Sequence, residues 1–282
     1  LASSAFISLA DYYNLVGEYD SAKNVAVQSL ALNNDLKNEY VESGAYISLG
    51  NTYNYLAENK TAVQYYFKAD SVYQAVNDPF SRAVPVNNIG TIFFHQGDFK
   101  NALLQFNEVY KQLEKVNYKG ELLITATLNI GEVYYEDGVL PEAEKWLKQG
   151  LQLSQNTGNN RGVASANLLL GKLCLKQKKY ITANTYLQAA YKNFNQIGEK
   201  ERIIETGTFL GKLYSQTNKN DSAKIYLSKA ISIAQQTGNT RYQWEPLYLS
   251  STISLKQKDT YLKTMRFAVY GRIWAVKYMQ IS

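Results

Sequence analysis

The chain has 282 residues, and its hydrophobic content of 45% and four prolines agree with a folded, largely helical protein. Its single cysteine excludes a disulfide within the chain, and no stretch reaches the roughly 20 uncharged apolar residues of a membrane span. The formal net charge of +6 conceals an asymmetry: residues 1–150 carry 11 Lys plus Arg against 18 Asp plus Glu, a net of −7, and residues 151–282 carry 19 against 6, a net of +13.

A short motif recurs along the chain: Leu or Ile, then Gly, then Tyr, Phe or Cys three residues after the Gly. The glycines follow one another at a nearly constant step, at Gly50, Gly90, Gly131, Gly171 and Gly211, and Ala10 takes this place in a first copy. Self-similarity at such a period indicates an array of one small unit, a solenoid. The motif therefore predicts the first helix of each unit.

A second motif follows each glycine motif after a short turn and predicts a second helix. Alanine occupies one constant position, at Ala62, Ala102, Ala143, Ala183 and Ala223, and a larger apolar residue follows four residues later. Glycine inside a helix costs roughly 0.5 to 1 kcal/mol relative to alanine, so its repeated use requires a compensating gain. We expect the Gly and Ala positions to allow close approach of two antiparallel helices.

These two motifs resemble the Leu-Gly-x-x-Tyr, Ala and Phe pattern of the tetratricopeptide repeat. The resemblance implies an all-α fold, a right-handed α-α superhelix of about six helix hairpins and a degenerate seventh. The period of about 40 instead of 34 is similar to long-repeat, sensor-type members of bacterial signalling proteins. The resemblance therefore implies the interaction region of a larger regulatory protein, in the bacterial cytoplasm or periplasm.

The period also predicts the domain organisation. We expect one repeat array over residues 1–258, with repeats at about 1–40, 41–80, 81–120, 121–160, 161–200, 201–240 and the start of a seventh at 241–258. Residues 259–282 depart from the repeat and carry apolar side chains almost all round a helix. They predict a capping helix or, at equal weight, a docking helix that forms a homodimer.

The resemblance implies that the first helices line a concave groove, and residues one and five after each Gly share a face because positions i and i+4 stack. Together with neighbours on that face, the predicted groove residues are Asn51, Asn54, Tyr55, Asn88, His95, Asn129, Glu132, Tyr135, Glu136, Lys172, Lys176 and Lys212. They run from amides through two carboxylates to three lysines.

Two interpretations stay open for these groove residues. The Asn side chains offer donors and acceptors to an extended peptide backbone, or they are merely solvated on an exposed face. Lys172 and Lys176 bind a ligand, or they pair with Glu132 and Glu136 of the preceding repeat, which would leave Lys212 as the free contact. Capture of an acidic C-terminus in the first repeat, which the family also shows, is not expected because Asp11 would repel it.

Other functions find less support in the sequence. His95 is the only histidine, and no phosphate loop follows a strand, so we expect no metal, no cofactor and no catalytic residue. The basic half could give weak nucleic-acid association, but its lysines are scattered and form no recognition motif. The sequence thus predicts a scaffold for a peptide or protein partner, with nucleic-acid binding or a purely structural dimerisation module as alternatives.

Overall fold

The computed structural model describes residues 2–238 and 242–256, and within them every regular element is a helix. The helices are α1 (Ala2–Val16), α2 (Tyr19–Leu36), α3 (Glu39–Tyr55), α4 (Asn59–Ala75), α5 (Pro79–His95), α6 (Phe99–Lys115), α7 (Glu121–Glu136), α8 (Leu140–Asn156), α9 (Asn160–Lys176), α10 (Tyr180–Ile197), α11 (Lys200–Gln216), α12 (Asn220–Gln236) and α13 (Trp244–Lys256). The predicted all-α helical-repeat class is confirmed.

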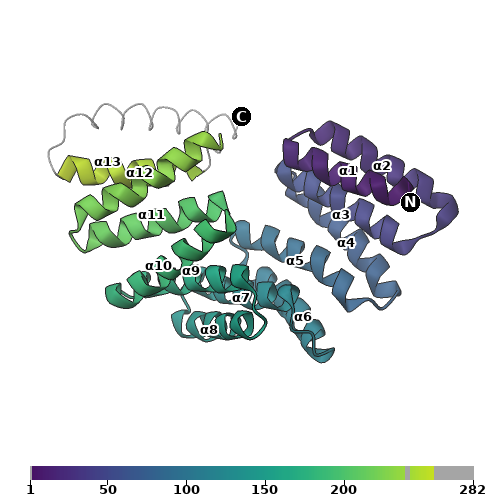
Figure 1. Ribbon diagram of the computed structural model, residues 1–282. Coiled ribbons are helices and arrows are strands. Elements are labelled where there is room, and N and C mark those ends of the chain that lie inside the picture. The colour runs from purple at the N-terminus through teal and green to yellow at the C-terminus, as the bar shows by residue number, and fades with distance from the viewer. Residues whose placement is uncertain (1, 239–241, 257–282) are drawn as a thin grey trace. The chain divides into compact units, whose positions relative to one another are not determined.

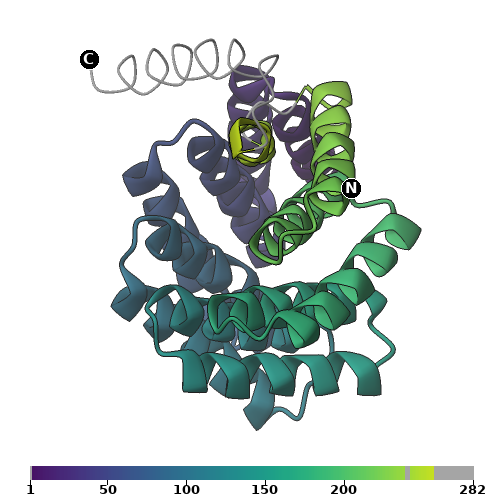
Figure 2. The same ribbon diagram turned by 90° about the vertical axis from the view of Figure 1, so that its left-hand side faces the viewer.

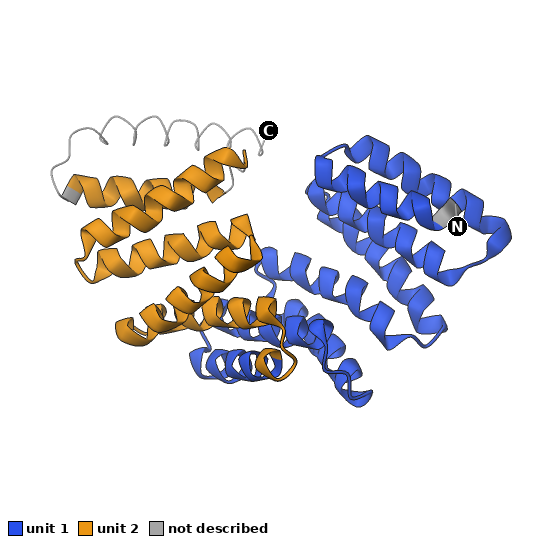
Figure 3. Ribbon diagram, viewed as in Figure 1, with its two compact units in different colours: residues 1–153 blue, residues 154–282 orange. Residues whose placement is uncertain are grey.

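The chain forms two compact units, residues 1–153 and residues 154–282 (Figure 3). In the first unit α1 packs on α2, α3 on α4 and α5 on α6, and in the second unit α9 packs on α10 and α11 on α12. Within each unit successive hairpins also contact one another, as at α2–α3, α4–α5 and α10–α11 (Figure 1 and Figure 2). No charged residue lies between 150 and 154, so the two units carry the net charges of −7 and +13.

The turns that separate the helices share one backbone feature. A residue with positive φ follows each helix from α1 to α12, and these residues are Gly17, Lys37, Ala57, Asn77, Gly97, Asn117, Gly138, Gly158, Lys178, Gly198, Asn218 and Gly238. After α3, for example, the Glu58 amide donates to the Tyr53 carbonyl and the Ala57 amide to the Asn54 carbonyl. This pattern ends a helix with a left-handed residue, a place that favours Gly or Asn.

Ala57 occupies this left-handed position with φ of 61°. Its Cβ strains the turn, so Ala57→Gly is expected to raise the free energy of unfolding by about 0.5–1 kcal/mol, after the entropy that glycine adds to the unfolded chain. Urea denaturation followed by circular dichroism measures this change. The matched control is Ala31→Gly inside α2, at an exposed position, where the same substitution should lower stability by about 1 kcal/mol. If both substitutions change the free energy of unfolding in the same direction, the backbone at Ala57 is not strained.

The repeated glycines lie against the large residues of their partner helices. A Cβ at Gly50, Gly90, Gly131, Gly171 or Gly211 would lie 2.5–2.7 Å from the side chain of Tyr66, Phe106, Leu147, Leu187 or Leu227, respectively. The five alanines of the second motif are fully buried. At Gly131 the neighbouring backbone is also close, because the Leu147 nitrogen would be 3.2 Å from that Cβ. Each glycine thus provides the space that one large side chain fills.

The predicted capping or docking helix at residues 259–282 lies outside the described residues. The helix before it, α13, begins the predicted seventh unit, and it packs on α11 and α12. Its buried Ile253 contacts Ala223 and Leu227 of α12. The helical repeat therefore continues into α13.

Candidate functional site

Three polar side chains from consecutive helices meet on the predicted groove face of the first unit. The Tyr66 hydroxyl donates to Oδ1 of Asn51 at 2.7 Å, and Nδ2 of Asn88 lies 3.5 Å from the same oxygen. Tyr66 is only 1% exposed, and its burial raises the pKa of the phenol. The structure therefore brings Asn51 of α3 and Asn88 of α5 together, with the phenol of α4 holding Asn51 in place.

A second amide pair joins the next two repeats. Nδ2 of Asn129 on α7 donates to Oδ1 of Asn87 on α5 at 2.9 Å. The other polar atom of each of these four amides has no protein partner among the described residues. The unpaired atoms are Nδ2 of Asn51, Nδ2 of Asn87, Oδ1 of Asn88 and Oδ1 of Asn129. All four residues are half-buried. The face thus retains two unused donors and two unused acceptors on side chains whose other ends are fixed.

The remaining groove residues predicted in the first unit occupy more open places. Asn54, Tyr55, His95 and Glu136 are exposed, whereas Glu132 and Tyr135 are half-buried. The ring of Tyr55 stacks on that of Tyr19, with centroids 5.9 Å apart and planes inclined by 18°. Asn54, Tyr55, His95, Tyr135 and Glu136 lie in the last turns of α3, α5 and α7, and Glu132 lies one turn after Asn129.

The lysines of the second unit lie in different surroundings from one another. Lys172 is only 7% exposed, and its Nζ lies 3.4 Å from Oε1 of Glu205, whose Oε2 accepts from Arg202 at 2.8 Å. Burial acts to raise the pKa of the Glu205 carboxyl, but the two cations outweigh it and lower that pKa. Lys176, by contrast, is exposed at the end of α9.

Lys212 lies close to this cluster but makes no ion pair within the described residues. Its Nζ is 5.7 Å from the centre of the Phe209 ring, and the Nζ of Lys172 is 5.3 Å from the same ring. Burial raises the pKa of the Glu245 carboxyl on α13, against the attraction of Lys212 and Lys172. Phe209 and Lys212 thus present an aromatic ring and a half-buried cation on one face of α11.

Sequence reasoning missed several of these partners. It left open whether Lys172 binds a ligand or pairs with the preceding repeat, whereas the structure places it beside Glu205 of the following repeat. The signal was present in the sequence, because Glu205 and Glu245 are separated by one repeat period, as are Lys172 and Lys212. Since Lys172 is buried, replacing it is expected to disturb the fold as well as any ligand contact.

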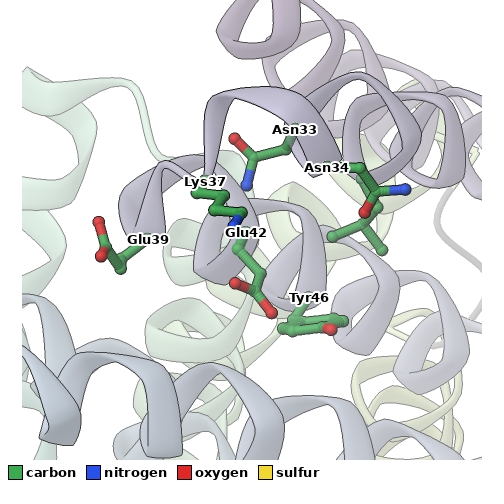
Figure 4. Close-up of a pocket in the computed structure, with 7 residues that line it drawn as sticks. Asn33, Asn34, Lys37, Glu39, Glu42 and Tyr46 are labelled. Carbon is green, nitrogen blue, oxygen red and sulfur yellow. The ribbon is translucent and has the colours of Figure 1, made fainter.

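A pocket of about 440 Å³ lies between the end of α2 and the start of α3 (Figure 4). Its lining residues are Leu30, Asn33, Asn34, Lys37, Glu39, Glu42 and Tyr46. Asn33 forms a rigid wall, because its side chain donates to the Asn38 carbonyl at 2.9 Å and accepts from the Asn38 amide at 3.1 Å. Figure 4 shows the Glu42 carboxylate directed toward the Tyr46 ring. The pocket is polar and does not include any predicted groove residue.

Residues 2–238 and 242–256 hold neither a metal-ligand cluster nor a membrane-spanning helix. This part of the chain contains no group of three or more His, Cys, Asp or Glu placed to hold a metal ion. None of its helices has the length and apolar character needed to cross a membrane.

Comparison with known proteins assigns the repeat. Family models described as tetratricopeptide repeat match residues 122–196 and residues 208–237. No curated protein matches the sequence. A signal transduction ATPase with numerous domains and a tetratricopeptide repeat sensor, from Pyrococcus horikoshii, is 17% identical over 99% of this chain and 43% of that one, with a TM-score of 0.74.

Two further solved structures resemble the chain over nearly their whole lengths. The apo form of RapI is 16% identical over 92% of this chain and 99% of that one, with a TM-score of 0.68. A Rap conjugation gene regulator of the plasmid pLS20, in complex with the Phr* peptide, is 12% identical over 92% of this chain and 81% of that one, with a TM-score of 0.68. The helix hairpins, the glycine and alanine pattern and the family matches identify tetratricopeptide repeats in this chain.

Proposed function

We propose that this chain is a binding scaffold without catalytic activity, which holds an extended peptide or a partner segment along the face of its first helices. The observation that carries the proposal is the set of half-used amides at Asn51, Asn87, Asn88 and Asn129. An extended peptide backbone presents alternating N–H donors and C=O acceptors, and the two unused Nδ2 and two unused Oδ1 groups match that alternation.

The fixed ends of these amides favour binding further. Asn51 is held by Tyr66, and Asn129 is held by Asn87, so each side chain loses little rotamer freedom when a ligand engages its other end. A preorganised amide ladder of this kind would recognise main chain and tolerate many side chains. Side-chain preference would then come from neighbouring groups such as the exposed Tyr55.

The second unit supports a preference for acidic ligand residues. Lys176 is exposed at the end of α9 and Lys212 is half-buried, whereas Lys172 is buried beside Glu205. We infer that these two lysines and not Lys172 contribute the charge contacts.

Proteins of similar fold fit this proposal. One of them was solved in complex with the Phr* peptide, and another carries the repeats as the sensor of a larger signal transduction ATPase. By that analogy the chain would serve as the interaction region of a regulatory protein.

A selection from a library of random linear peptides tests the proposal directly. Peptides that bind the full chain are synthesised, and their affinities are measured by fluorescence anisotropy for the chain and for Asn88→Ala with Asn129→Ala. Loss of two hydrogen bonds of about 1 kcal/mol each predicts roughly 10- to 30-fold weaker binding. N-methylation of single peptide amides should have a similar effect, because the ladder reads the backbone.

The matched control is Asn24→Ala, which removes an exposed amide from α2 and should leave the affinity unchanged. Equal affinities for the double variant and the original chain would show that these amides do not bind the ligand. Failure to enrich any linear peptide would count against peptide binding as a whole.

A further inference from the structure

One ion pair of the second unit has a counterpart one repeat later whose two charges do not meet. Lys172 and Glu205 are 33 residues apart in the chain, and so are Lys212 and Glu245. The Nζ of Lys172 lies 3.4 Å from the Glu205 carboxylate. Across residues 154–238 and 242–256, by contrast, no ion pair or hydrogen bond involves the charged groups of Lys212 and Glu245. We call these two residues the open pair.

The open pair lies in the same structural setting as its closed counterpart. α13 packs on α12 through Ile253, and α11 packs on α10 through Leu213, which occupies the corresponding position one repeat earlier. α13 also contacts α11 directly. Lys212 acts to lower the pKa of the Glu245 carboxyl, so the two charges are near enough to interact. The repeat therefore brings Lys212 and Glu245 to neighbouring places without joining them.

Both side chains of the open pair are half-buried, so a missing partner costs free energy at each of them. At Glu205 two cations outweigh burial and lower the pKa of the carboxyl, whereas at Glu245 burial prevails and raises it. Among the described residues, no cation lies within ion-pair distance of Glu245, and no anion lies within that distance of Lys212. A ligand that carries one charge of each sign would satisfy both side chains through charge-assisted hydrogen bonds.

An aromatic ring borders the open pair. Phe209 is half-buried, and the Nζ of Lys212 lies 5.7 Å from the centre of its ring. Phe209 precedes Lys212 by three residues, so the two side chains lie on one face of α11. An apolar ligand group placed against this ring would gain free energy by leaving water, and an aromatic group would gain further from ring–ring contact.

We propose that the open pair binds a free α-amino acid with an apolar side chain. The ligand's carboxylate accepts from Lys212, its ammonium group donates to Glu245, and its side chain lies against Phe209. Both charged groups of an α-amino acid are attached to one carbon, so a single small molecule bridges α11 and α13. The inference rests on the ligand-binding role proposed above for Lys212, and it does not depend on the amides of the first unit.

Titration of the full chain with L-phenylalanine, followed by saturation-transfer NMR, tests this proposal. N-acetyl-L-phenylalanine lacks the ammonium group, and L-phenylalanine amide lacks the carboxylate. Each derivative should bind at least about tenfold more weakly than the free amino acid, because each loses one charge-assisted hydrogen bond. Equal binding of the three compounds would overturn the proposal.

Two variants assign the ends of the ligand to the two residues. Lys212→Met should bind L-phenylalanine about tenfold more weakly and should no longer distinguish it from the amide. Glu245→Gln should show the same loss and should no longer distinguish L-phenylalanine from its N-acetyl derivative. The control is Lys229→Met with Asp221→Asn, which removes one exposed cation and one exposed anion from α12 and should leave binding unchanged.

Hydrogen exchange of α13 provides a second measurement. A ligand that joins α13 to α11 should slow exchange at residues 247–256 by up to about tenfold when its concentration is about ten times its dissociation constant, and should leave α1 unchanged. Binding that leaves α13 unprotected would contradict the bridge, and so would a failure of both L-phenylalanine and L-leucine to bind. Asn88→Ala with Asn129→Ala should bind L-phenylalanine as the original chain does, so this inference and the proposed peptide binding can fail separately.

Discussion

Gly50→Ala is expected to lower the free energy of unfolding by about 2 kcal/mol, although alanine is the better helix former. A Cβ at Gly50 would lie 2.5 Å from Cε1 of Tyr66, which is 1% exposed and cannot swing away. Its hydroxyl is bonded to Asn51 at 2.7 Å, so any displacement of the ring also weakens that hydrogen bond. Overpacking of about 1–3 kcal/mol and loss of a hydrogen bond of about 1 kcal/mol outweigh the gain in helix propensity.

Gly44→Ala in the same helix provides the matched control. A Cβ there would meet only Cδ1 of Ile7 at 2.9 Å, the far end of a flexible and half-buried side chain. We expect this variant to be neutral or up to about 1 kcal/mol more stable, because the higher helix propensity of alanine then determines the change in stability. Urea denaturation of both variants separates the two cases. Similar changes at the two positions would show that close approach is not the reason for Gly50.

The repeat could be predicted because its sequence motifs recur at a regular spacing. The five glycines and five alanines each recur at one spacing, and the structure places each glycine of α3, α5, α7, α9 and α11 against its partner helix. Both the all-α class and the tetratricopeptide resemblance are confirmed. The left-handed turn at Ala57 was not predicted, since neither Gly nor Asn marks it. There the fold imposes the conformation on a residue that does not favour it.

Contacts between repeats were harder to predict, for a geometric reason. Equal positions of successive repeats do not face each other. Asp11, one residue after the glycine position, contacts Ser48, two residues before Gly50, and Lys172 contacts Glu205, six residues before Gly211. The contacting positions thus differ by three residues in the first pair and by seven in the second, but by only one between Asn87 and Asn129, so a comparison of equal positions cannot reveal the contacts. The sequence placed Asn51, Asn88 and Asn129 on one face but did not predict the hydrogen bond from Asn129 to Asn87.

Arg82→Met is expected to give the largest loss of stability, about 2–4 kcal/mol. Arg82 of α5 joins two other helices: its Nε lies 2.6 Å from Oδ1 of Asp70 on α4, and its Nη1 lies 3.2 Å from Oε1 of Glu108 on α6. Burial acts to lower the pKa of the guanidinium, but the two carboxylates raise it. Asp70 is only 9% exposed, so without Arg82 it keeps a buried charge that has lost its partner.

A double-mutant cycle distinguishes this explanation from a simple loss of packing. Asp70→Asn combined with Arg82→Met removes both charges, so the double variant should recover about 1–3 kcal/mol relative to the sum of the single changes. The Lys145–Glu142 pair serves as the control, because its atoms are 3.8 Å apart and both side chains are largely solvated. Lys145→Met should change stability by less than about 0.5 kcal/mol. Additive effects at Asp70 and Arg82 would mean that the ion pair does not couple α4 to α5, and that apolar contacts alone hold these two hairpins together.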